Sequence, residues 1–489
     1  MIIEIKTNQR YKKNDIEQPV RLMDLLTSLG FAIHADCGGK GKCGKCTVKI
    51  TPLDNGMPMT AESFSVLSCE YIPDRDILVE FNEENGSGLL DHSENKHIRA
   101  DAGKNGYGAV IDLGTTTLAL YLIDMKTGET LSAKSELNPQ RRYGADVISR
   151  IDACMRGKKN ELHKAISEKT AELLKSVYSE YGTESANCLY VTGNTTMLHL
   201  FLGEDPSGIG VFPFTPVFLE SRRVSGESLG IPVGEIVTMP CIGSYIGGDA
   251  VCAAAASELD KGNYLMIDIG TNGELVLYSD GKYYSTSTAA GPALEGANIT
   301  CGCGGISGAI NRVLCKNGQI SYATVNSAEA VGICGSGLID AIAVMLECGI
   351  IDETGAFCDE DEDEFYISDK VFISAKDVRE FQLAKSAVAS GINVLIKRAG
   401  LTYDDIENVY IAGGLGFYID CGSAAKTGLI PKELISKVKI IGNGAALGTK
   451  MALLTNGVFD KMIAIAESAK AIDLANDADF ADEFIENMF

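Results

Sequence analysis

Apolar and polar residues follow two different rhythms along this chain, and the change of rhythm divides it. Residues 1–82 predict a compact domain with short strands and one amphipathic helix that ends at Gly30. The strands expected there are Met1–Lys6, Thr47–Ile50 and Ile77–Phe81, and the helix is Val20–Leu29. Residues 83–106 are rich in glycine and polar side chains, which is typical of a linker.

From Tyr107 onward, apolar strands alternate with amphipathic helices, which predicts an α/β layer architecture. A weak internal repeat lies within this part. Val110–Tyr121 reads VIDLGTTTLALY, and Met266–Leu277 reads MIDIGTNGELVL. Each copy has an apolar strand, an aspartate, a Gly-Thr turn and a second strand, so we expect a duplicated fold with a cleft between its halves. The expected limits are 107–260 and 261–456, followed by a helical tail over 457–489.

Composition narrows the class of protein. Hydrophobic residues make up 45% and charged residues 22%, as in ordinary globular domains. The net charge is −23, and it falls almost entirely beyond residue 81, so nucleic acid is an unsuitable partner. No run of about 20 apolar residues predicts a membrane span, and the first residues lack a secretory pattern, so we expect a cytoplasmic protein.

Four of the fifteen cysteines have the spacing of iron–sulfur ligands. Cys37, Cys43 and Cys46 lie in one glycine-rich loop, DCGGKGKCGKC, and Cys69 follows after 22 residues. Three loop ligands with one distant ligand are the ferredoxin arrangement for a [2Fe–2S] cluster. A zinc site is the alternative, although zinc sites usually pair two short C-x2-C clips.

Three glycine-rich strand ends predict a nucleotide site in the remainder of the chain. In IDLGTTT, Asp112 ends a strand, Gly114 opens a turn, and the following hydroxyls can face phosphate oxygens. The second half offers the same pattern in IDIGTNGE, and VYIAGGLG provides a third element suited to adenosine. Because Mg²⁺ keeps several waters, an aspartate at each strand end can hold it through water. The residues expected to bind ATP and Mg²⁺ are Asp112, Gly114, Thr115, Thr116, Thr117, Asp268, Gly270, Thr271, Asn272, Gly413 and Gly414.

This order of motifs resembles the superfamily of acetate and sugar kinases, heat-shock chaperones and actin. The segment GDAVCAAAA, at Gly248–Ala256, is similar to a segment of carbohydrate kinases whose aspartate is the catalytic base. The resemblance implies that Asp249 orients or deprotonates an attacking water. The alternative is that Asp249 merely caps the alanine-rich helix.

The whole chain resembles the ATP-dependent reductive activators of corrinoid proteins. The segments that carry this resemblance are the cysteine loop, AVIDLGTTT, LNPQRRYGADVISRI (Leu137–Ile151), Gly193–Gly203, YIGGDA, Ala289–Ile299, Ile333–Ala341 and YIAGGLG. The resemblance implies a multidomain α/β and α+β fold. An N-terminal β-grasp ferredoxin-like domain and a linker would precede a duplicated actin-like (ribonuclease H-like) ATPase domain.

The same resemblance implies a function. One electron would pass from a low-potential cellular donor, through the [2Fe–2S] cluster, to Co(II) in the corrinoid protein of a methyltransferase system, with ATP driving the step. It also favours a homodimer. Two other classes stay open: a small-molecule kinase with a redox-sensing domain, and an activator of a radical dehydratase. A plain electron carrier is a further alternative.

Overall fold

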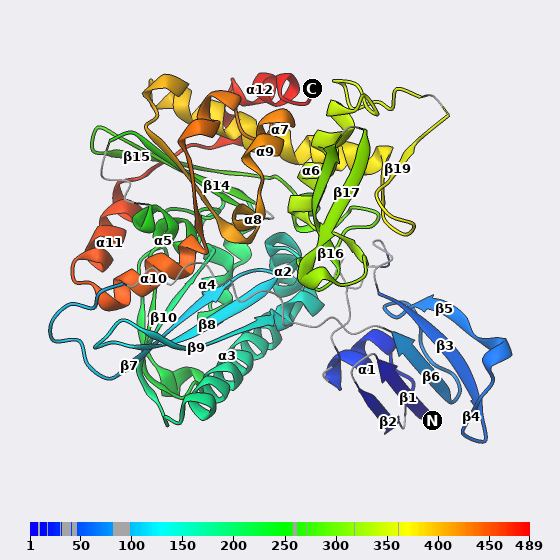
Figure 1. Ribbon diagram of the computed structural model, residues 1–489. Helices are drawn as coiled ribbons and strands as arrows, with labels where there is room; N and C mark the ends of the chain where they lie inside the picture. Colours follow the sequence, from blue (N-terminus) through cyan, green and yellow to red (C-terminus); the bar gives the residue numbers. More distant parts are fainter. Residues whose placement is uncertain are drawn as a thin grey trace.

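A computed structural model describes residues 1–7, 10–16, 18–29, 31, 41, 46–81, 98–257, 262–270, 272–316, 318–359 and 361–489. Three mixed sheets organise these residues (Figure 1). One sheet belongs to the N-terminal part, and the other two are the centres of two similar α/β halves. Within the described part of the chain, no helix combines the length and apolarity that crossing a lipid bilayer requires.

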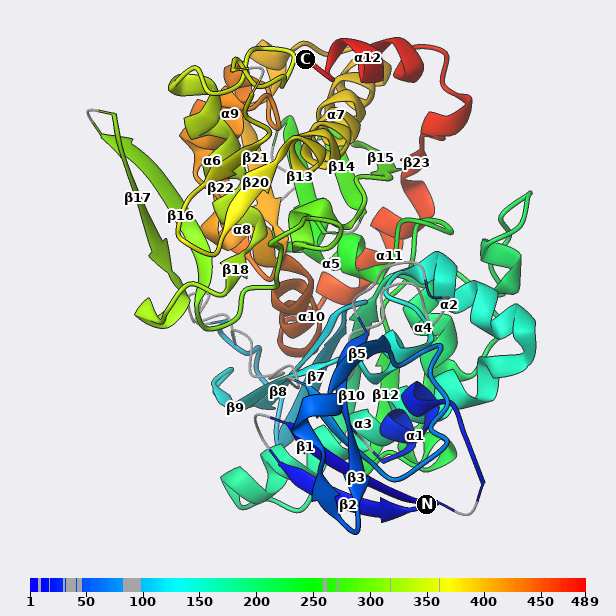
Figure 2. The same cartoon turned by 90° about the vertical axis from the view of Figure 1, so that its right-hand side faces the viewer.

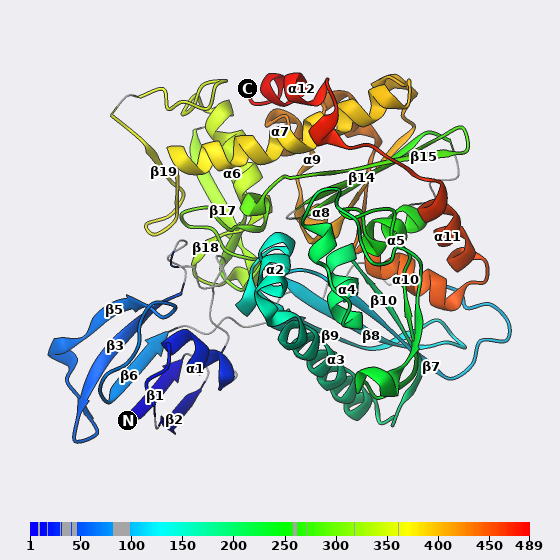
Figure 3. The same ribbon diagram turned by 180° about the vertical axis from the view of Figure 1, so that it is seen from behind.

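The N-terminal sheet has the order β2-β1-β6-β3-β4, with β5 also on β3. Its strands are β1 (Ile2–Thr7), β2 (Tyr11–Asp15), β3 (Thr47–Asp54), β4 (Met57–Pro58), β5 (Phe64–Leu67) and β6 (Ile77–Phe81). Helix α1 (Leu22–Ser28) covers it, since alternate strand residues such as Ile3, Ile5 and Val79 form one buried cluster with Leu22 and Leu26. In Figures 1 and 3 this domain is set to one side of the larger body.

The first half contains a sheet in the order β11-β12-β10-β7-β8-β9. Its strands are β7 (Tyr107–Leu113), β8 (Thr117–Asp124), β9 (Thr130–Leu137), β10 (Ala186–Gly193), β11 (Arg223–Ser225) and β12 (Val233–Thr238). Its helices are α2 (Val147–Ala153), α3 (Lys159–Tyr181) and α4 (Thr195–Leu202). Residues 98–106, expected to be linker, contact this half, where Asn187 Nδ2 donates to Asn105 O at 3.2 Å, and they also contact the second half, where Asp101 N–H donates to Leu454 O.

The second half repeats the plan in the order β22-β21-β13-β14-β15-β23. Its strands are β13 (Tyr264–Ile269), β14 (Gly273–Ser279), β15 (Lys282–Thr288), β21 (Asn408–Ala412), β22 (Val438–Gly442) and β23 (Lys470–Ala471). In both halves three antiparallel strands in sequence order are extended by parallel strands, β10 on β7 and β21 on β13. This confirms the duplicated fold that the two Gly-Thr motifs predicted.

Smaller elements complete the second half. A projecting hairpin of β16 (Ala309–Lys316) and β17 (Gln319–Thr324) is clear in Figure 2, with β18 (Gly332–Ile333) on its other side. A second hairpin joins β19 (Glu364–Tyr366) and β20 (Phe372–Ser374). The helices are α6 (Gly335–Glu347), α7 (Ala375–Arg398), α8 (Gly413–Tyr418), α9 (Cys421–Lys426), α11 (Val458–Ser468) and α12 (Phe480–Glu486).

Two helices form the contact between the halves. Helix α5 (Gly248–Ala256) follows the first half, and α10 (Gly444–Leu454) follows the last long strand of the second. Both are rich in alanine and glycine, so their backbones pack closely, and their apolar side chains belong to buried clusters. Figures 1 and 2 show the two helices side by side between the two sheets. The loops before these helices are therefore held where the two sheets approach each other.

Candidate functional site

Two aspartates at equivalent strand positions define the candidate site. Asp112 lies near the end of β7, and Asp268 lies near the end of β13. In the parallel registers Asp112 is level with Thr192, and Asp268 is level with Ala412. Asp249 joins them from the first turn of α5. All three side chains keep part of their surface exposed, as expected of groups that can meet a ligand.

Two hydrogen bonds connect residues of the two halves at this point. Asn443, which precedes α10, donates from Nδ2 to Oδ2 of Asp112 at 2.9 Å. Thr116, in the β7–β8 turn, donates from Oγ1 to Oε2 of Glu295 at 3.3 Å. The predicted phosphate residues of the first half are thus in direct contact with the second half.

The third predicted motif lies against the second. Gly413 has a φ of +85°, and a Cβ atom there would lie 2.3 Å from Oδ1 of Asp268. Any side chain at this position would therefore displace the carboxylate. Gly414 follows in open space, with nothing within 4 Å of a Cβ atom built on it. The structure brings Gly413, Gly414 and Asp268 together.

The predicted turn residues flank these aspartates. Gly114, Thr115 and Thr116 form the β7–β8 turn, and Thr117 opens β8. A Cβ atom on Gly114 would lie 2.5 Å from Thr117 O, so only glycine permits this tight turn. The equivalent residues of the second half are Gly270 and Asn272, and the N–H of Gly270 donates to Asn272 O at 3.0 Å. Thr271 lies outside the described residues.

Burial raises the pKa values of the three central carboxyls, and repulsion between carboxylates adds to the shift at two of them. Burial raises the pKa of Asp112 to about 6, partly offset by the hydrogen bond from Asn443. Burial, and then the charge of Asp112, raises the pKa of Asp249 to about 7. The pKa of Asp268 rises to about 7 through burial and the charges of Asp249 and Asp112. Burial is the largest cause of all three shifts, and neighbouring negative charge adds to it at Asp249 and Asp268.

Two further carboxylates belong to the same group, and the sequence motifs did not single them out. Burial and the charges of Asp249 and Asp268 raise the pKa of Glu274 well above its usual value. Glu295 contributes to the repulsion on Asp268. We call Asp112, Asp249, Asp268, Glu274 and Glu295 the carboxylate cluster. The available signals were their positions, because Glu274 ends the quoted segment IDIGTNGE and Glu295 lies within the quoted segment Ala289–Ile299.

The carboxylate cluster suits a hydrated cation better than a directly ligated one. Among the described residues, no three His, Cys, Asp or Glu side chains converge closely enough to hold a metal ion. Mg²⁺ commonly retains several waters and contacts few carboxylates, so these side chains fit a Mg²⁺ ion bound through water. Such an ion would relieve the repulsion that raises the pKa values.

Asp249 lies in the first turn of α5 but is not its N-cap. The N-cap residue is Gly247, which has no side chain, and Oδ1 of Asp249 accepts from Ala250 N–H at 2.9 Å. Its charge interacts with Asp112, Asp268 and Glu274. A role for Asp249 as the helix cap would therefore not account for its charge interactions with the other carboxylates.

Two of the four predicted cluster ligands fall within the described residues. Cys46 and Cys69 are both buried and share one apolar cluster with Met23 of α1. The backbone joins them too, because Ser68 N–H donates to Cys46 O at 3.0 Å. Cys37 and Cys43 lie outside the described residues. A pair of neighbouring buried thiols fits the ligand set of a [2Fe–2S] cluster.

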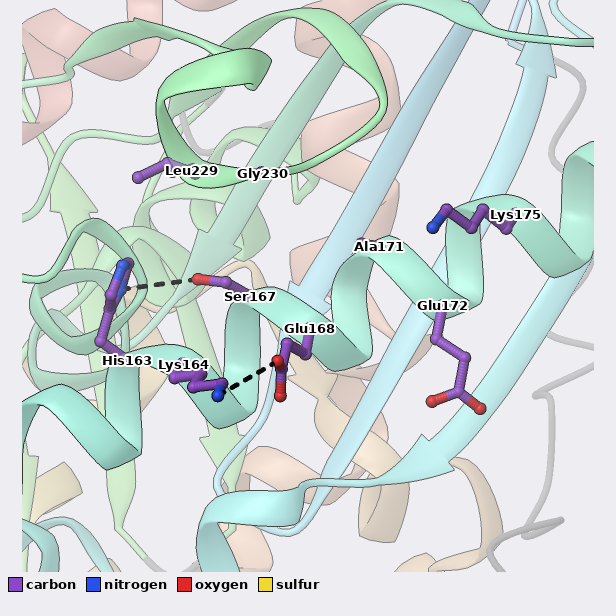
Figure 4. A pocket seen from close by; sticks show the side chains of 9 residues that line it. All are labelled: His163, Lys164, Ser167, Glu168, Ala171, Glu172, Lys175, Leu229 and Gly230. Carbon is purple, nitrogen blue, oxygen red and sulfur yellow. Dashed lines mark hydrogen bonds and ion pairs between the residues drawn. The ribbon is translucent and has the colours of Figure 1, made fainter.

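A cavity of about 540 Å³ lies elsewhere, along α3 (Figure 4). It is lined by His163, Ser167 and Glu168 of α3, and by Leu229 and Gly230 across from it. None of its lining residues belongs to the carboxylate cluster. Its Lys164–Glu168 ion pair, at 3.7 Å, is an ordinary helix-surface pair.

Three family models match the chain in sequence order. A 2Fe-2S iron-sulfur cluster binding domain matches residues 7–74. The RACo middle region matches residues 107–262, and the C-terminal domain of RACo, the ASKHA domain, matches residues 262–489. The first supports a [2Fe–2S] cluster, and the ASKHA ATPase domain supports ATP binding.

Characterised relatives and a solved structure agree with these matches. The corrinoid activation enzyme RamQ of Eubacterium limosum is 30% identical over 97% of this chain and 96% of its own length. The [Co(II) methylated amine-specific corrinoid protein] reductase of Methanosarcina barkeri is 26% identical over 75% of this chain and 73% of its own. The solved structure of a reductive activator for a corrinoid, iron-sulfur protein has a TM-score of 0.73. It shows 27% identity and covers 100% of this chain and 98% of its own.

Proposed function

The chain belongs to the family of RACo-type corrinoid activation enzymes, and on that premise we propose that it performs ATP-dependent reductive activation of a corrinoid protein. One electron would pass from the [2Fe–2S] domain to Co(II) and return the cobalt to Co(I), ready for methyl transfer. The observation that carries the proposal is that one chain joins an iron–sulfur domain to a two-half ATPase and is similar over nearly its full length to the corrinoid activation enzyme RamQ.

The free energy needed to reduce Co(II) explains why electron transfer would be coupled to ATP. Moving one electron uphill by 100 mV costs about 2.3 kcal/mol. Reduction of Co(II) to Co(I) lies at very low potential, so an ordinary ferredoxin-type donor needs help. Nucleotide binding between the two halves would supply it by favouring a conformation in which the partner's cobalt is reducible.

Separate groups of residues in this chain would hold the cluster, the Mg²⁺ ion and the nucleotide. Cys37, Cys43, Cys46 and Cys69 would hold the cluster, which supplies a one-electron carrier. Asp112 and Asp268 would hold Mg²⁺ through water. The phosphate-facing groups would be Gly114, Thr115, Thr116, Thr117, Gly270, Thr271 and Asn272, and Gly413 and Gly414 would face adenosine.

Asp249 would orient or deprotonate the attacking water. Support comes from its raised pKa of about 7, which lets it accept a proton near neutral pH. Its charge interactions with Asp112, Asp268 and Glu274, which flank the predicted phosphate residues, also support this role. A cytoplasmic location, a homodimer and a low-potential cellular electron donor complete the proposal.

The test combines purified protein with a low-potential reductant, a Co(II) corrinoid protein and MgATP. Visible spectra should show Co(I) appearing with ATP and not without it. Replacing the corrinoid protein by a hydroxylated sugar should give no phosphorylated product. ATP-independent Co(I) formation, or phosphoryl transfer to the sugar, would contradict the proposal.

A further inference from the structure

Three consecutive carbonyl groups of the β7–β8 turn are held by one segment, residues 138–150. Nδ2 of Asn138 donates to Gly114 O at 2.8 Å, and the backbone N–H of Asn138 donates to Thr116 O at 2.9 Å. Between them, Nη2 of Arg150 donates to Thr115 O. Hydrogen bonds from residues 138–150 therefore hold the carbonyls of Gly114, Thr115 and Thr116, in the turn that carries the predicted phosphate residues.

Fixing the carbonyls also fixes the amides. In a trans peptide unit the C=O and N–H groups point in opposite directions. The carbonyls of Gly114 and Thr115 face residues 138–150, so the N–H groups of Thr115 and Thr116 face away from that segment. Within the described part of the chain, these two N–H groups donate to no protein acceptor. Successive amides aimed one way form an anion-binding concavity.

Arg150 is unusual because its side chain is completely buried. It is held by α2, which begins at the capping box of Asp146 and Ser149. Its guanidinium makes two further hydrogen bonds: Nε donates to Gly144 O at 3.0 Å, and Nη1 donates to Met197 Sδ at 2.9 Å. No ion pair of the described residues includes Arg150.

A buried cation without an ion-pair partner is costly unless another negative group compensates it. Burial, and then the positive charge of Arg141, lowers the pKa of Arg150 to about 9, and the nearby charges of Asp146 and Glu295 offset only part of that shift. The guanidinium is still cationic at neutral pH. Its position one peptide unit behind the free amides places its charge where a bound polyphosphate would benefit from it.

We propose that Arg150, supported by Asn138, is a positioning residue that orients the β7–β8 turn and makes it selective for nucleotide polyphosphates. The inference rests on the proposed ATP-dependent function. Arg150 acts through the turn: it holds Thr115 O, aims the amides of Thr115 and Thr116, and adds positive potential behind them. Nucleotides without β- and γ-phosphates gain little from this arrangement.

The experiment measures ATP, ADP and AMP affinities by calorimetry for the full-length protein and three variants. Arg150→Met keeps the volume and removes the charge, and Arg150→Lys keeps the charge but cannot span the same acceptors. Arg156→Met is the matched control, since Arg156 is exposed, follows α2 closely, and pairs only with Asp152 at 3.3 Å. Thermal melting and the cluster absorbance check folding.

R150M should bind ATP and ADP roughly tenfold or more weakly, with AMP affinity changed less than about twofold. R150K should fall between R150M and the wild type, and R156M should match the wild type. Unchanged ATP affinity in R150M, or equal losses for all three nucleotides, would overturn the inference. If R150M does not fold, R150K decides by the same comparison. Failure of the wild type to bind any nucleotide would instead refute the proposed function.

Discussion

Thr116 Oγ1 and Glu295 Oε2 lie 3.3 Å apart, and their hydrogen bond joins residues separated by 179 positions in the chain. Thr116 belongs to the turn after the first strand of one half, and Glu295 belongs to a short 3-10 helix of the other. A bond of this kind couples the relative position of the halves to the geometry of the β7–β8 turn. We expect it to change whenever a nucleotide closes the halves on each other.

Removing that bond should weaken the coupling without disturbing either half. Thr116→Val keeps the side-chain shape and deletes the hydroxyl, so corrinoid-stimulated ATP hydrolysis should fall by roughly tenfold, since a loss of about 1.4 kcal/mol is typical of such a bond in a polar site. Thr127→Val, on an exposed turn, is the control. Steady-state kinetics provide the measurement, and unchanged hydrolysis in T116V would show that the bond is dispensable.

Asn443 should set the proton affinity of Asp112. It also caps α10 by accepting from Ala446 N–H at 2.7 Å. Asn443→Ser keeps a capping oxygen but loses the amide donor that lowers the pKa of Asp112. The acidic limb of the ATPase pH profile should therefore move upward by roughly one pH unit. An unmoved limb in N443S would mean that Asp112 does not govern the profile.

The carboxylate cluster should make the nucleotide-free protein less stable as pH rises. The pKa values of Asp112, Asp249 and Asp268 are about 6, 7 and 7 in the folded protein, against about 3.9 for an unfolded aspartate. The folded state therefore binds more protons between these values, and its stability declines as pH rises through about 7.

Melting temperature between pH 5.5 and 8 measures this effect. The wild type should melt at lower temperature as pH increases, and Asp268→Asn should show a shallower decline. Adding MgADP should also flatten the curve, since a cation would compensate the charges. Asp361→Asn, an exposed carboxylate, serves as the control and should retain the full slope. A melting temperature that rises over this interval would contradict the assignment.

The iron–sulfur domain should be separable from nucleotide binding. Cys46→Ser or Cys69→Ser should abolish the visible absorbance of the cluster and electron transfer, because thiolates hold the iron. Affinity for ATP should change less than about twofold, since the two sites use different residues. Cys358→Ser, at an exposed position, should keep both properties. Loss of bound zinc instead of iron in C46S would favour the zinc alternative.

Local patterns predicted local structure well. The strand expected at Ile77–Phe81 is β6, because its apolar residues alternate with the pleat, and the helix expected within Val20–Leu29 is α1. Strand β2 was missed because YKKND has no apolar alternation. It is exposed and depends on backbone pairing with β1.

The candidate site was predictable only in part, because local motifs reveal some of its residues and long-range contacts bring in the others. Asp112 and Asp268 lie near the ends of apolar strands and precede Gly-Thr turns, so the sequence alone predicts them as candidate site residues. Asn443 lies 331 positions from Asp112, and its role follows from the packing of α5 against α10. Glu295 and Arg150 lie in the quoted segments Ala289–Ile299 and Leu137–Ile151, but their contacts with Thr116 and Thr115 arise from the fold and cannot be derived from those segments alone.

The most direct test of ATP-dependent electron transfer from the cluster to cobalt follows one electron during a single turnover. Protein with a pre-reduced cluster is mixed anaerobically with a Co(II) corrinoid protein, and MgATP is then added without further reductant. We expect cluster reoxidation and Co(I) formation to occur together, in equal amounts, and only after ATP is added. Co(I) formation without cluster reoxidation, or equal transfer in the absence of ATP, would contradict this expectation.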